Sequence, residues 1–414
     1  MRSLIRKNAF SMIKEIKITN FYGFQESTVV LQPDTNILIG INGSGKSNFL
    51  KAIKFLKEGV SGVGLQKHIL ENLGGFDNIF FKGYLEGSKS ISLEFILDAH
   101  QISQNRNGFR FTDDISYKIT LIRSLSTQNF YLIEKITNEK GFLYLDFNNG
   151  NGKLTEKTEG GLNNKTNLKN YSDFNPRELV LRGISETEND RYFALTTIKK
   201  AIMNIVVYDY FDTTPKSLIR KPMLPTSEER LSPDGTNLPQ ILNTIKINHK
   251  QEYRKITESL SEVNPNFSGF DFNLIGGNIE LMLDEKNLNS AVHVSNISDG
   301  TLRYLCLLAI LFNPERGSLI CIDEPEVGLH PDMIFNISKA IKYASENSQI
   351  IVSTHSENLL NYFEIENVLV FEKDDNNATQ INSYTRNQFE GWYDKFAVGQ
   401  MWQKGDLGGK RYGN

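Results

Sequence analysis

Short apolar runs alternate with helical patterns near both ends of this 414-residue chain. Mostly apolar runs at 36–39, 319–322 and 349–353 predict buried strands. Apolar residues at helical spacing follow the first run, at 48–56, and predict a helix that begins directly behind a glycine-rich turn. Together these elements predict an α/β fold.

The first part of the middle region has a period of two instead. Hydrophobic and polar residues alternate in segments such as 91–97, 117–121 and 130–134, which predicts antiparallel strands. Residues 148–175 are rich in Asn, Gly, Lys and Thr, and this composition predicts an exposed loop or flexible tip.

Helical stripes dominate the second part of the middle region. Apolar residues recur at i, i+3, i+4 and i+7 within 238–245, and another stripe occupies 253–263. Prolines interrupt the segment 215–239, so the helices are too short for long coiled-coil arms. The alternating run 279–283 is expected to return the chain to the α/β domain as a strand.

These patterns divide the chain into five segments. The expected division is 12–90 for the N-terminal part of the α/β domain, 91–147 for an antiparallel β-lobe, 148–175 for a flexible polar insertion, 176–275 for a helical insertion, and 276–414 for the C-terminal part of the α/β domain.

Composition agrees with a globular protein. Hydrophobic residues make up 39% of the chain, charged residues make up 23%, and the formal net charge is −3. No run reaches the roughly 18 to 20 apolar residues that a membrane-spanning helix needs, so we expect a cytoplasmic protein without a membrane part. Cys306 and Cys321 are both in apolar surroundings and are expected to be core residues.

The glycine-rich turn at residues 40–47 has the form G-x-x-x-x-G-K-S. In this pattern backbone N–H groups curl around phosphates, while the lysine and the hydroxyl reach the β/γ-oxygens and Mg²⁺. A predicted strand precedes the turn and a predicted helix follows it, which places the phosphates at a helix N-terminus. The residues expected to bind ATP here are Gly40, Asn42, Gly43, Ser44, Gly45, Lys46, Ser47 and Asn48.

Two acids, Asp323 and Glu324, end the apolar run at 319–322. Buried carboxylates side by side need a cation or an unusual role to be tolerated. In an ATPase with this kind of loop, the aspartate holds Mg²⁺ and the next residue can polarise the attacking water. Taken alone, the same pattern also fits a strand that runs into an acidic turn.

Several motifs resemble those of ABC-type ATPases of the RecF, SMC and OLD kind. Residues 323–331, Asp-Glu-Pro-Glu-Val-Gly-Leu-His-Pro, resemble their Walker B motif and D-loop, and Ser-Thr-His-Ser at 353–356 matches their H-switch. The stretch 296–305, with Ser-Asp-Gly-Thr at its centre, resembles their signature motif, and 16–24 is similar to their first strand and turn. The tail from residue 399 resembles that of bacterial stand-alone ATPases, many of which are encoded beside defence or toxin-like partners.

The resemblance implies a catalytic set of Lys46, Glu324 and His355. Lys46 would contact the β/γ-phosphates, Glu324 would position the water, and His355 would touch the γ-phosphate. Mg²⁺ would be held by Ser47 and Asp323. The residues that contact the adenine stay open, and Gln66 is a candidate for the Q-loop by position only.

The same resemblance implies a dimer. Ser298, Asp299 and Gly300 of the signature would bind a nucleotide held by a second subunit. Two ATP molecules would then be sandwiched between two chains arranged head to tail.

Two functions remain open from the sequence. In the first, an ATP-driven dimer controls a separate effector protein, as in bacterial anti-phage systems. In the second, the chain is a RecF-like repair ATPase that clamps DNA; the acidic net charge argues mildly against this, and the modest basic patch at 216–221 is expected to be solvated surface. No nuclease is expected, because the segment after His355 is shorter than a typical domain.

Overall fold

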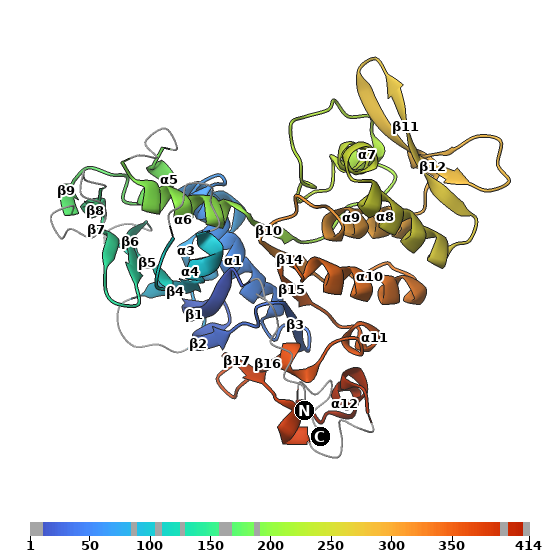
Figure 1. Cartoon of the computed structure of the whole chain (residues 1–414). Helices are drawn as coiled ribbons and strands as arrows, with labels where there is room; N and C mark the ends of the chain where they lie inside the picture. The colour runs from blue at the N-terminus through green and yellow to red at the C-terminus, as the bar shows by residue number, and fades with distance from the viewer. Residues whose placement is uncertain are drawn as a thin grey trace.

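A six-stranded sheet lies in the middle of the molecule and separates two lobes (Figure 1). The computed structural model describes residues 11–83, 89–103, 110–124, 129–156, 168–185, 191–389 and 396–408. Five neighbouring strands of the central sheet are parallel, and the last strand pairs antiparallel. Their order is β10 (Ile205–Tyr208), β14 (Leu319–Asp323), β15 (Gln349–Ser353), β3 (Thr35–Gly40), β16 (Val368–Lys373) and β17 (Thr379–Ser383).

The strands predicted from apolar runs are confirmed as β3, β14 and β15. All six residues of β3 and all five of β15 are buried. Continuous burial follows from the parallel arrangement, because helices cover both faces of such a sheet. The apolar runs in the sequence therefore mark the central strands.

An eight-stranded antiparallel sheet forms one lobe, on the left of Figure 1. Its strands alternate buried and half-buried residues, as in β4, because one face packs on the core. The strands, in spatial order, are β2 (Phe24–Val30), β1 (Ile13–Phe21), β4 (Ser90–Leu97), β5 (Ile115–Arg123), β6 (Phe130–Asn138), β7 (Leu143–Asn148), β8 (Asn151–Thr155) and β9 (Leu168–Tyr171).

The predicted alternation from 90 to 147 is confirmed by strands β4 to β7. The N-terminal strands β1 and β2 extend the same sheet. Strands β8 and β9 lie in the segment expected to be a flexible tip, so that expectation is wrong for the nine residues they contain. The rest of that insertion between them, 157–167, lies outside the described residues.

Helix α1 (Lys46–Val60) links this lobe to the central sheet. It contacts β3, β10 and β14 on one side and α6 on the other, and its apolar residues belong to one core with those of the β-lobe. The remaining helices on this side are α2 (Leu65–Lys67), the π-helical turn η1 (His68–Asn72), α3 (Phe76–Ile79), α4 (Ala99–Ile102), α5 (Val180–Gly183) and α6 (Phe193–Met203).

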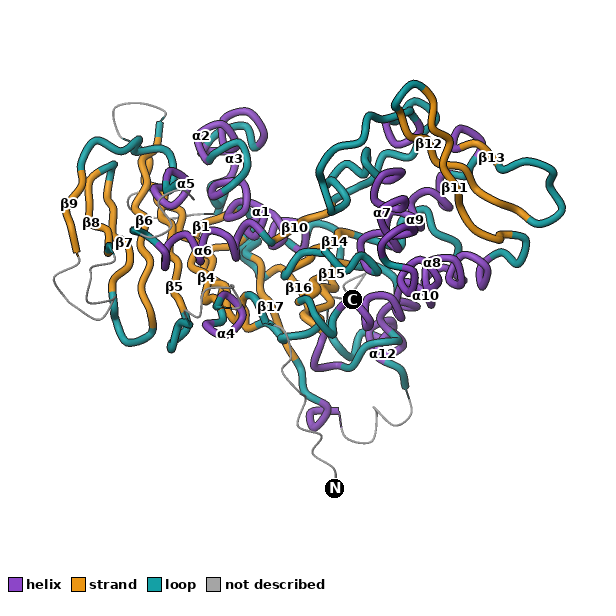
Figure 2. Tube along the Cα trace, turned by 45° about the horizontal axis from the view of Figure 1, so that its top comes forward, coloured by secondary structure: helices purple, strands orange, loops and turns teal. Residues whose placement is uncertain are grey.

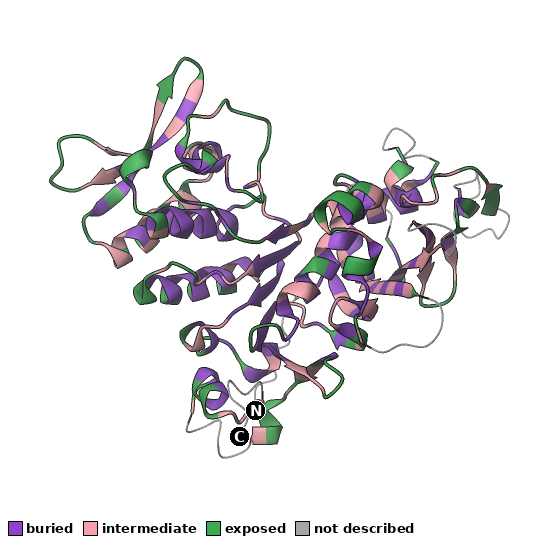
Figure 3. Cartoon of the chain, turned by 180° about the vertical axis from the view of Figure 1, so that it is seen from behind, coloured by how far each residue is buried: buried purple, intermediate pink, exposed green. Residues whose placement is uncertain are grey.

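The opposite lobe is built from helices and a small sheet (Figure 2). The predicted stripes are confirmed as α7 and α8, which pack on α9 in a second core. Helix α9 is buried over nearly its whole length, as Figure 3 shows. The elements are α7 (Leu238–Asn248), α8 (Lys250–Val263), β11 (Phe267–Ile275), β12 (Asn278–Glu285), β13 (Val292–His293), α9 (Asp299–Leu311) and α10 (Pro331–Ala344), followed by α11 (Glu357–Leu360) and α12 (Val398–Lys404) near the chain's end.

The expected strand at 279–283 exists, but its place was predicted wrongly. It is part of β12, which pairs with β11 and β13 in a separate three-stranded sheet rather than in the central sheet. The apolar side chains of β12 pack on α7, and β11 contacts α7 and α8, so this small sheet completes the helical lobe.

The buried side chain of Gln349 ties the two large sheets together. Its Oε1 accepts hydrogen bonds from the backbone N–H groups of Met12 and Ile13, at 3.1 and 2.9 Å. Its Nε2 donates to the carbonyl oxygens of Ile13 and Gln32, both at 2.9 Å. Since buried amides must be satisfied, this glutamine fixes β1 against the start of β15. No helix among the described residues has the length and apolar character to span a membrane.

Candidate functional site

The carboxyl ends of three neighbouring parallel strands bring the predicted site residues together. Strand β15 lies between β14 and β3. Asp323 at the end of β14 is in register with Ser353 at the end of β15, and Ser353 is in register with Leu38 of β3. The turns that follow these strands therefore meet at one edge of the sheet, where ligands of open α/β sheets bind.

The glycine-rich loop between β3 and α1 needs glycine for steric reasons. Gly40 has φ of 147°, and a Cβ there would lie 2.3 Å from the carbonyl oxygen of Phe371. Gly45 has φ of 118°, and a Cβ there would lie 2.6 Å from Oγ1 of Thr379. Both conformations disfavour residues with a side chain. Close packing of β16 and β17 against the loop therefore restricts its backbone conformation.

Thr379 on β17 also holds the loop by a hydrogen bond. Its Oγ1 donates to the carbonyl oxygen of Ser44 at 2.8 Å, and its own N–H donates to the carbonyl oxygen of Gly23 at 2.7 Å. The threonine therefore connects the loop to the turn between β1 and β2. The sequence analysis did not identify Thr379, because it lies far along the chain from the motif that it supports.

The loop has the polar groups that phosphate binding requires. Nζ of Lys46 donates to the carbonyl oxygens of Gly40 and Ile41, at 2.9 and 3.3 Å, so the ammonium lies inside the loop. Oγ of Ser44 is buried and has no hydrogen-bond partner among the described residues. The first turn of α1 lacks a side-chain cap, which leaves its N–H groups available. These features fit an anion at this position.

Burial lowers the pKa of Lys46, while the carboxylates of Glu324, Asp323 and Glu326 act in the opposite direction. This coupling shows that the acids after β14 face the loop closely enough to influence the lysine electrostatically. Ser47 and Asn48 are half-buried in the first turn of the helix, whereas Asn42 and Gly43 are exposed at the loop tip.

The two predicted acids have different surroundings. Oδ1 of Asp323 accepts a hydrogen bond from Oγ of Ser353, which fixes the carboxylate at the end of the strand. Glu324 has a positive φ of 47°, and its N–H donates to the carbonyl oxygen of Ser353 at 3.0 Å. The chain thus turns sharply between the acids, so the Glu324 side chain does not follow the strand direction.

His355 and Glu324 lie next to each other. Nε2 of His355 is 3.4 Å from Oε1 of Glu324, and both side chains are partly exposed, at 28% and 39%. A water or phosphate oxygen can therefore reach both groups from solvent. The structure places the predicted acid and the predicted histidine in one cluster.

Glu326 was missed by the sequence analysis. Its Oε1 accepts hydrogen bonds from Oγ1 of Thr354 at 2.8 Å and from the N–H of His355 at 2.7 Å. Burial raises the pKa of Glu326. The residue stands three positions after Asp323, so the acid-rich turn could have suggested it, but only the fold shows that it holds the turn carrying His355.

The signature residues are built into the other lobe. Ser298 caps α9: its Oγ accepts from the N–H of Thr301 at 3.2 Å. A Cβ on Gly300 would lie 2.8 Å from the carbonyl oxygen of Gly328, so the start of α9 approaches the turn after β14 closely. Helix α9 packs on α7, α8 and α10, whereas α1 packs on β3, β10 and β14. The signature therefore belongs to a different core from the glycine-rich loop.

The basic patch at 216–221 was expected to be solvated, and this is wrong for Arg220. Its side chain is 4% exposed, and its Nη2 lies 2.6 Å from Oδ1 of Asp299 in an ion pair. The positive charge of Arg220 is paired within the protein, at the signature turn, because a buried guanidinium needs partners for its donors.

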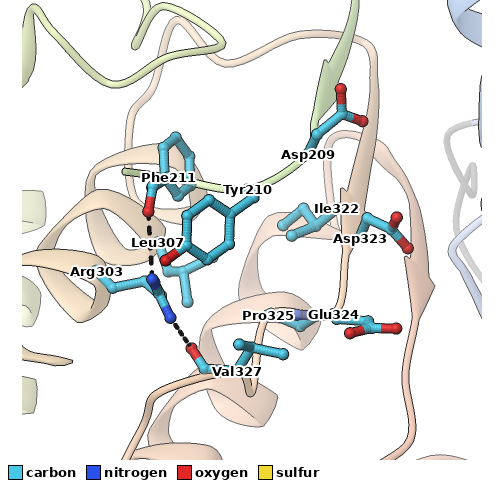
Figure 4. A pocket seen from close by; sticks show the side chains of 10 residues that line it. All are labelled: Asp209, Tyr210, Phe211, Arg303, Leu307, Ile322, Asp323, Glu324, Pro325 and Val327. Atoms are coloured by element: carbon cyan, nitrogen blue, oxygen red, sulfur yellow. Dashed lines mark hydrogen bonds between the residues drawn. The ribbon is translucent and has the colours of Figure 1, made fainter. Parts of the chain in front are cut away.

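A pocket of about 230 Å³ lies between the acids and α9 (Figure 4). The segment after β10 forms one wall with Tyr210 and Phe211, and Arg303 of α9 forms another. Arg303 donates to the carbonyl oxygens of Val327 and Phe211, and its guanidinium lies 4.4 Å from the centre of the Tyr210 ring. Through Arg303, the signature helix is hydrogen-bonded to the turn that follows Glu324.

The site has no ready-made cage for a metal ion. Among the residues that the structure describes, no group of three or more His, Cys, Asp and Glu side chains could hold a metal. Ser47 and Asp323 would supply two protein oxygens to a cation that also binds the phosphates of a nucleotide, an arrangement typical of Mg²⁺.

Comparison with known proteins gives a consistent result. A family model described as "AAA domain, putative AbiEii toxin, Type IV TA system" matches residues 35–361. The chain is 23% identical over 389 residues to the Old nuclease of Escherichia phage P2. This match covers 88% of the chain but only 60% of the nuclease. It is 23% identical over 379 residues to an ATP/GTP phosphatase of Helicobacter pylori, covering 89% of the chain and 91% of that protein. The Retron Ec83 probable ATPase of Escherichia coli is 22% identical over 407 residues, with 86% and 70% covered.

Solved structures with a similar fold include heads of SMC proteins. The Smc head bound to the C-winged helix domain of ScpA superimposes with a TM-score of 0.58 and 13% identity, covering 91% of this chain and 99% of that one. The Smc head with an extended coiled coil from Pyrococcus furiosus gives a TM-score of 0.57 and 12% identity, covering 91% and 97%. The likeness confirms the predicted ABC-ATPase head fold.

Proposed function

The chain belongs to the family described as "AAA domain, putative AbiEii toxin, Type IV TA system" and is an ATPase of the SMC, RecF and OLD-like group. From this premise we propose that it dimerises head to tail around ATP and controls a separate effector protein. One observation carries the proposal. The glycine-rich loop, the acid pair and the histidine turn follow three adjacent parallel strands, and the signature stands apart in the other lobe.

Lys46, Ser44 and the first turn of α1 bind the phosphates. The buried Oγ of Ser44 gains a partner when a phosphate oxygen enters the loop, because it has none among the described residues. Lys46 exchanges its bonds to the Gly40 and Ile41 carbonyls for a phosphate. Its charge and the free N–H groups of the helix favour the anion.

Ser47 and Asp323 are the residues that would hold Mg²⁺. When bound with the nucleotide, this cation neutralises phosphate charge during hydrolysis. The Ser353 hydroxyl keeps the Asp323 carboxylate at the edge of the sheet that faces the loop.

Glu324 positions the attacking water. Its side chain is 39% exposed directly after the strand end, and its carboxylate can accept a hydrogen bond from the water. His355, 3.4 Å away, reaches the oxygens of the terminal phosphate and is held by the bond between its N–H and Glu326. These two side chains act on the same phosphate from adjacent strands.

A second copy of the chain completes the site. Ser298 and Gly300 begin the 13-residue helix α9, whose core is separate from that of α1. The N-terminus of α9 is therefore supplied to the nucleotide bound by the other copy, as in the resemblance to RecF- and SMC-like heads. ATP becomes the link between two chains, and its hydrolysis separates them.

The effector role is supported by the names of relatives. A retron ATPase matches 86% of this chain, and the family description includes a toxin system. An ATP-dependent change in dimer geometry is a suitable signal to a partner, because binding of a nucleotide at the interface biases one arrangement of the two lobes.

The test uses the Glu324→Gln variant, tagged and expressed from its own operon. We expect it to bind ATP, to turn over at least about a hundredfold more slowly than the natural protein, and to elute as a dimer with one other protein at fixed stoichiometry. Lys46→Ala is the control that binds no nucleotide, and Lys118→Ala, an exposed substitution on β5, is the control for a lost charge.

Two outcomes contradict parts of the proposal. Normal turnover in Glu324→Gln would remove Glu324 as the water-positioning residue. Retention of nucleic acid without any protein partner would replace the effector role by the DNA-clamp alternative.

A further inference from the structure

Arg220 makes four hydrogen bonds inside the helical lobe. It ends the short 3₁₀ turn Leu218–Arg220, and its side chain is 4% exposed. Its Nε donates to the carbonyl oxygen of Thr213 at 2.9 Å, and its Nη2 donates to Oδ1 of Asp299 at 2.6 Å. Its Nη1 donates to the two carbonyl oxygens just before the signature, those of Val294 at 2.6 Å and Ile297 at 2.8 Å.

These bonds converge on the turn that leads into α9. Val294 begins a 3₁₀ turn that ends at Asn296, and Ile297 is directly followed by the cap residue Ser298. Arg220 therefore holds the backbone at the start of this 3₁₀ turn and directly after its end. The cost of burying the guanidinium is offset because most of its donors are paired, one of them with a carboxylate.

The carboxylate of Asp299, which pairs with Arg220, lies at the start of the signature helix. Asp299 is the first residue of α9, and its side chain is 56% exposed. In the proposed dimer this carboxylate faces the phosphates of the nucleotide held by the other copy. Without the arginine, the Asp299 carboxylate would repel these phosphates, because bringing like charges together costs free energy.

We propose that Arg220 is a positioning residue for the signature: it neutralises Asp299 and fixes the turn at 294–299, so that the start of α9 can accept the nucleotide of a second copy. The inference rests on the proposed head-to-tail dimer and names a residue that the motif itself does not contain. Arg220 acts through Asp299 and the backbone, and it does not touch the nucleotide.

The experiment compares four variants in the Glu324→Gln background. They are R220M, which keeps the apolar volume, D299N, the double variant R220M/D299N, and R316M. Arg316 is the control, since it is a half-buried arginine whose Nη1 also donates to a backbone carbonyl, that of Asn313. The dissociation constant of the ATP-bound dimer is measured by sedimentation velocity, and ATP binding to the monomer is measured with a fluorescent analogue at low protein concentration.

We expect R220M to weaken the dimer at least about tenfold while leaving ATP affinity of the monomer unchanged. D299N removes the repelling charge but does not restore the hydrogen bonds to the backbone, so the double variant should recover part of the lost affinity, while R316M should stay within about threefold of the parent. A role of Arg220 in stability alone would not produce rescue by D299N.

The outcomes separate the two proposals. If the Glu324→Gln parent does not dimerise with ATP, the proposed function fails and takes this inference with it. If the parent dimerises, but R220M dimerises equally well or is not rescued by D299N, only the role of Arg220 fails. Should R220M not fold, R220Q, which also removes the charge, replaces it, with a loss of dimer affinity that D299N again reduces.

Discussion

The backbone of Glu324 shows how a single residue separates the two acids after β14. Its φ of 47° is in the left-handed region, which costs a residue with a side chain on the order of 1 kcal/mol or more. The N–H of Glu324 is held by the carbonyl oxygen of Ser353. Because of this turn, Asp323 stays at the strand end while Glu324 lies beside His355. Strain of this kind is common at active sites.

Glu326 offers a test at the same scale. Substitution Glu326→Ala removes the acceptor for the Thr354 hydroxyl and the His355 N–H, so the turn carrying His355 is no longer held. We expect the kcat for ATP hydrolysis to fall between about tenfold and a hundredfold, with ATP affinity unchanged, since a small misplacement of a reacting group has effects of this size. Steady-state kinetics and nucleotide titration check both values.

Glu326→Gln is the matched control, because its amide oxygen can still accept both hydrogen bonds. It should retain most of the activity. Equal turnover in Glu326→Ala and the natural protein would show that the His355 turn does not depend on this side chain.

Among the elements, the hairpin of β16 and β17 supports the glycine-rich loop. The carbonyl oxygen of Phe371 lies where a side chain on Gly40 would be, and Thr379 both packs on Gly45 and donates to Ser44. The loop is therefore shaped by residues that follow it by more than 300 positions. Preorganisation of this kind lowers the cost of ordering the loop when a ligand binds.

The substitution Thr379→Val tests this support. Valine keeps the shape but removes the hydroxyl donor, so the loop loses one hydrogen bond worth about 1 kcal/mol. We expect ATP affinity to weaken about fivefold with little change in the melting temperature. Thr379→Ser, which keeps the hydroxyl, should bind ATP nearly as well as the natural protein in calorimetric titration. Unchanged affinity in Thr379→Val would exclude this role.

A second element-scale feature is the buried anchor between β6 and α5. Glu134 accepts hydrogen bonds from the Tyr117 hydroxyl at 2.6 Å and from the N–H groups of Val180 and Leu181. Burial raises the pKa of Glu134 from 4.5 to about 7, against the effect of these hydrogen bonds. The native state thus holds a proton that the unfolded chain releases at lower pH.

The sign of the pH dependence follows directly. Protonation of Glu134 stabilises the native state below pH 4.5, and this contribution is lost as the pH rises to about 7 and above. The loss amounts to about 3 kcal/mol in the free energy of unfolding. Urea denaturation at pH 5 and pH 8 should show a smaller decrease for Glu134→Gln than for the natural protein. The exposed Glu139→Gln is the control, and an equal decrease in all three proteins would contradict the assignment.

At the scale of the whole molecule, the protein has two hydrophobic cores. One core joins α1 to the antiparallel sheet, and the other joins α9 to the helical lobe, with strands of the central sheet contributing to both. Arg303 joins α9 to the edge of the central sheet near the site, since it donates to the carbonyl oxygens of Val327 after the acid pair and of Phe211 after β10. The turn that follows the acid pair is therefore hydrogen-bonded to the signature helix within the same chain.

The dimer prediction belongs to this scale. Substitution Ser298→Arg in the Glu324→Gln background places a bulky charge at the start of α9 and should prevent the ATP-dependent dimer without removing ATP from the monomer. Ser298→Ala loses the cap of α9, at a cost of about 1 kcal/mol, but adds no bulk, so it controls for helix stability. Light scattering with and without ATP gives the mass. An unchanged ATP-dependent mass in Ser298→Arg would exclude the head-to-tail arrangement.

The predictable part of the site was its motifs. The residues of the glycine-rich loop, Asp323, Glu324 and His355 were all identified from spacing and resemblance, and their strands were identified from apolar runs. The roles of these residues in catalysis stay predictions, as do the magnesium ligands and the boundaries of the five segments. The supporting residues Thr379, Glu326 and Arg220 were not predicted, because each is joined to its motif by a contact rather than by spacing.

The sequence by itself determined the fold class and the ATPase family, because a strand period, a helix period and a phosphate-binding loop are local properties of the chain. The tertiary structure alone decided which strands are neighbours, that β12 forms a separate small sheet, and that Arg220 is buried against Asp299. Such facts depend on contacts between residues far apart in the chain, and their stability comes from shared burial and paired charges, which no local pattern records.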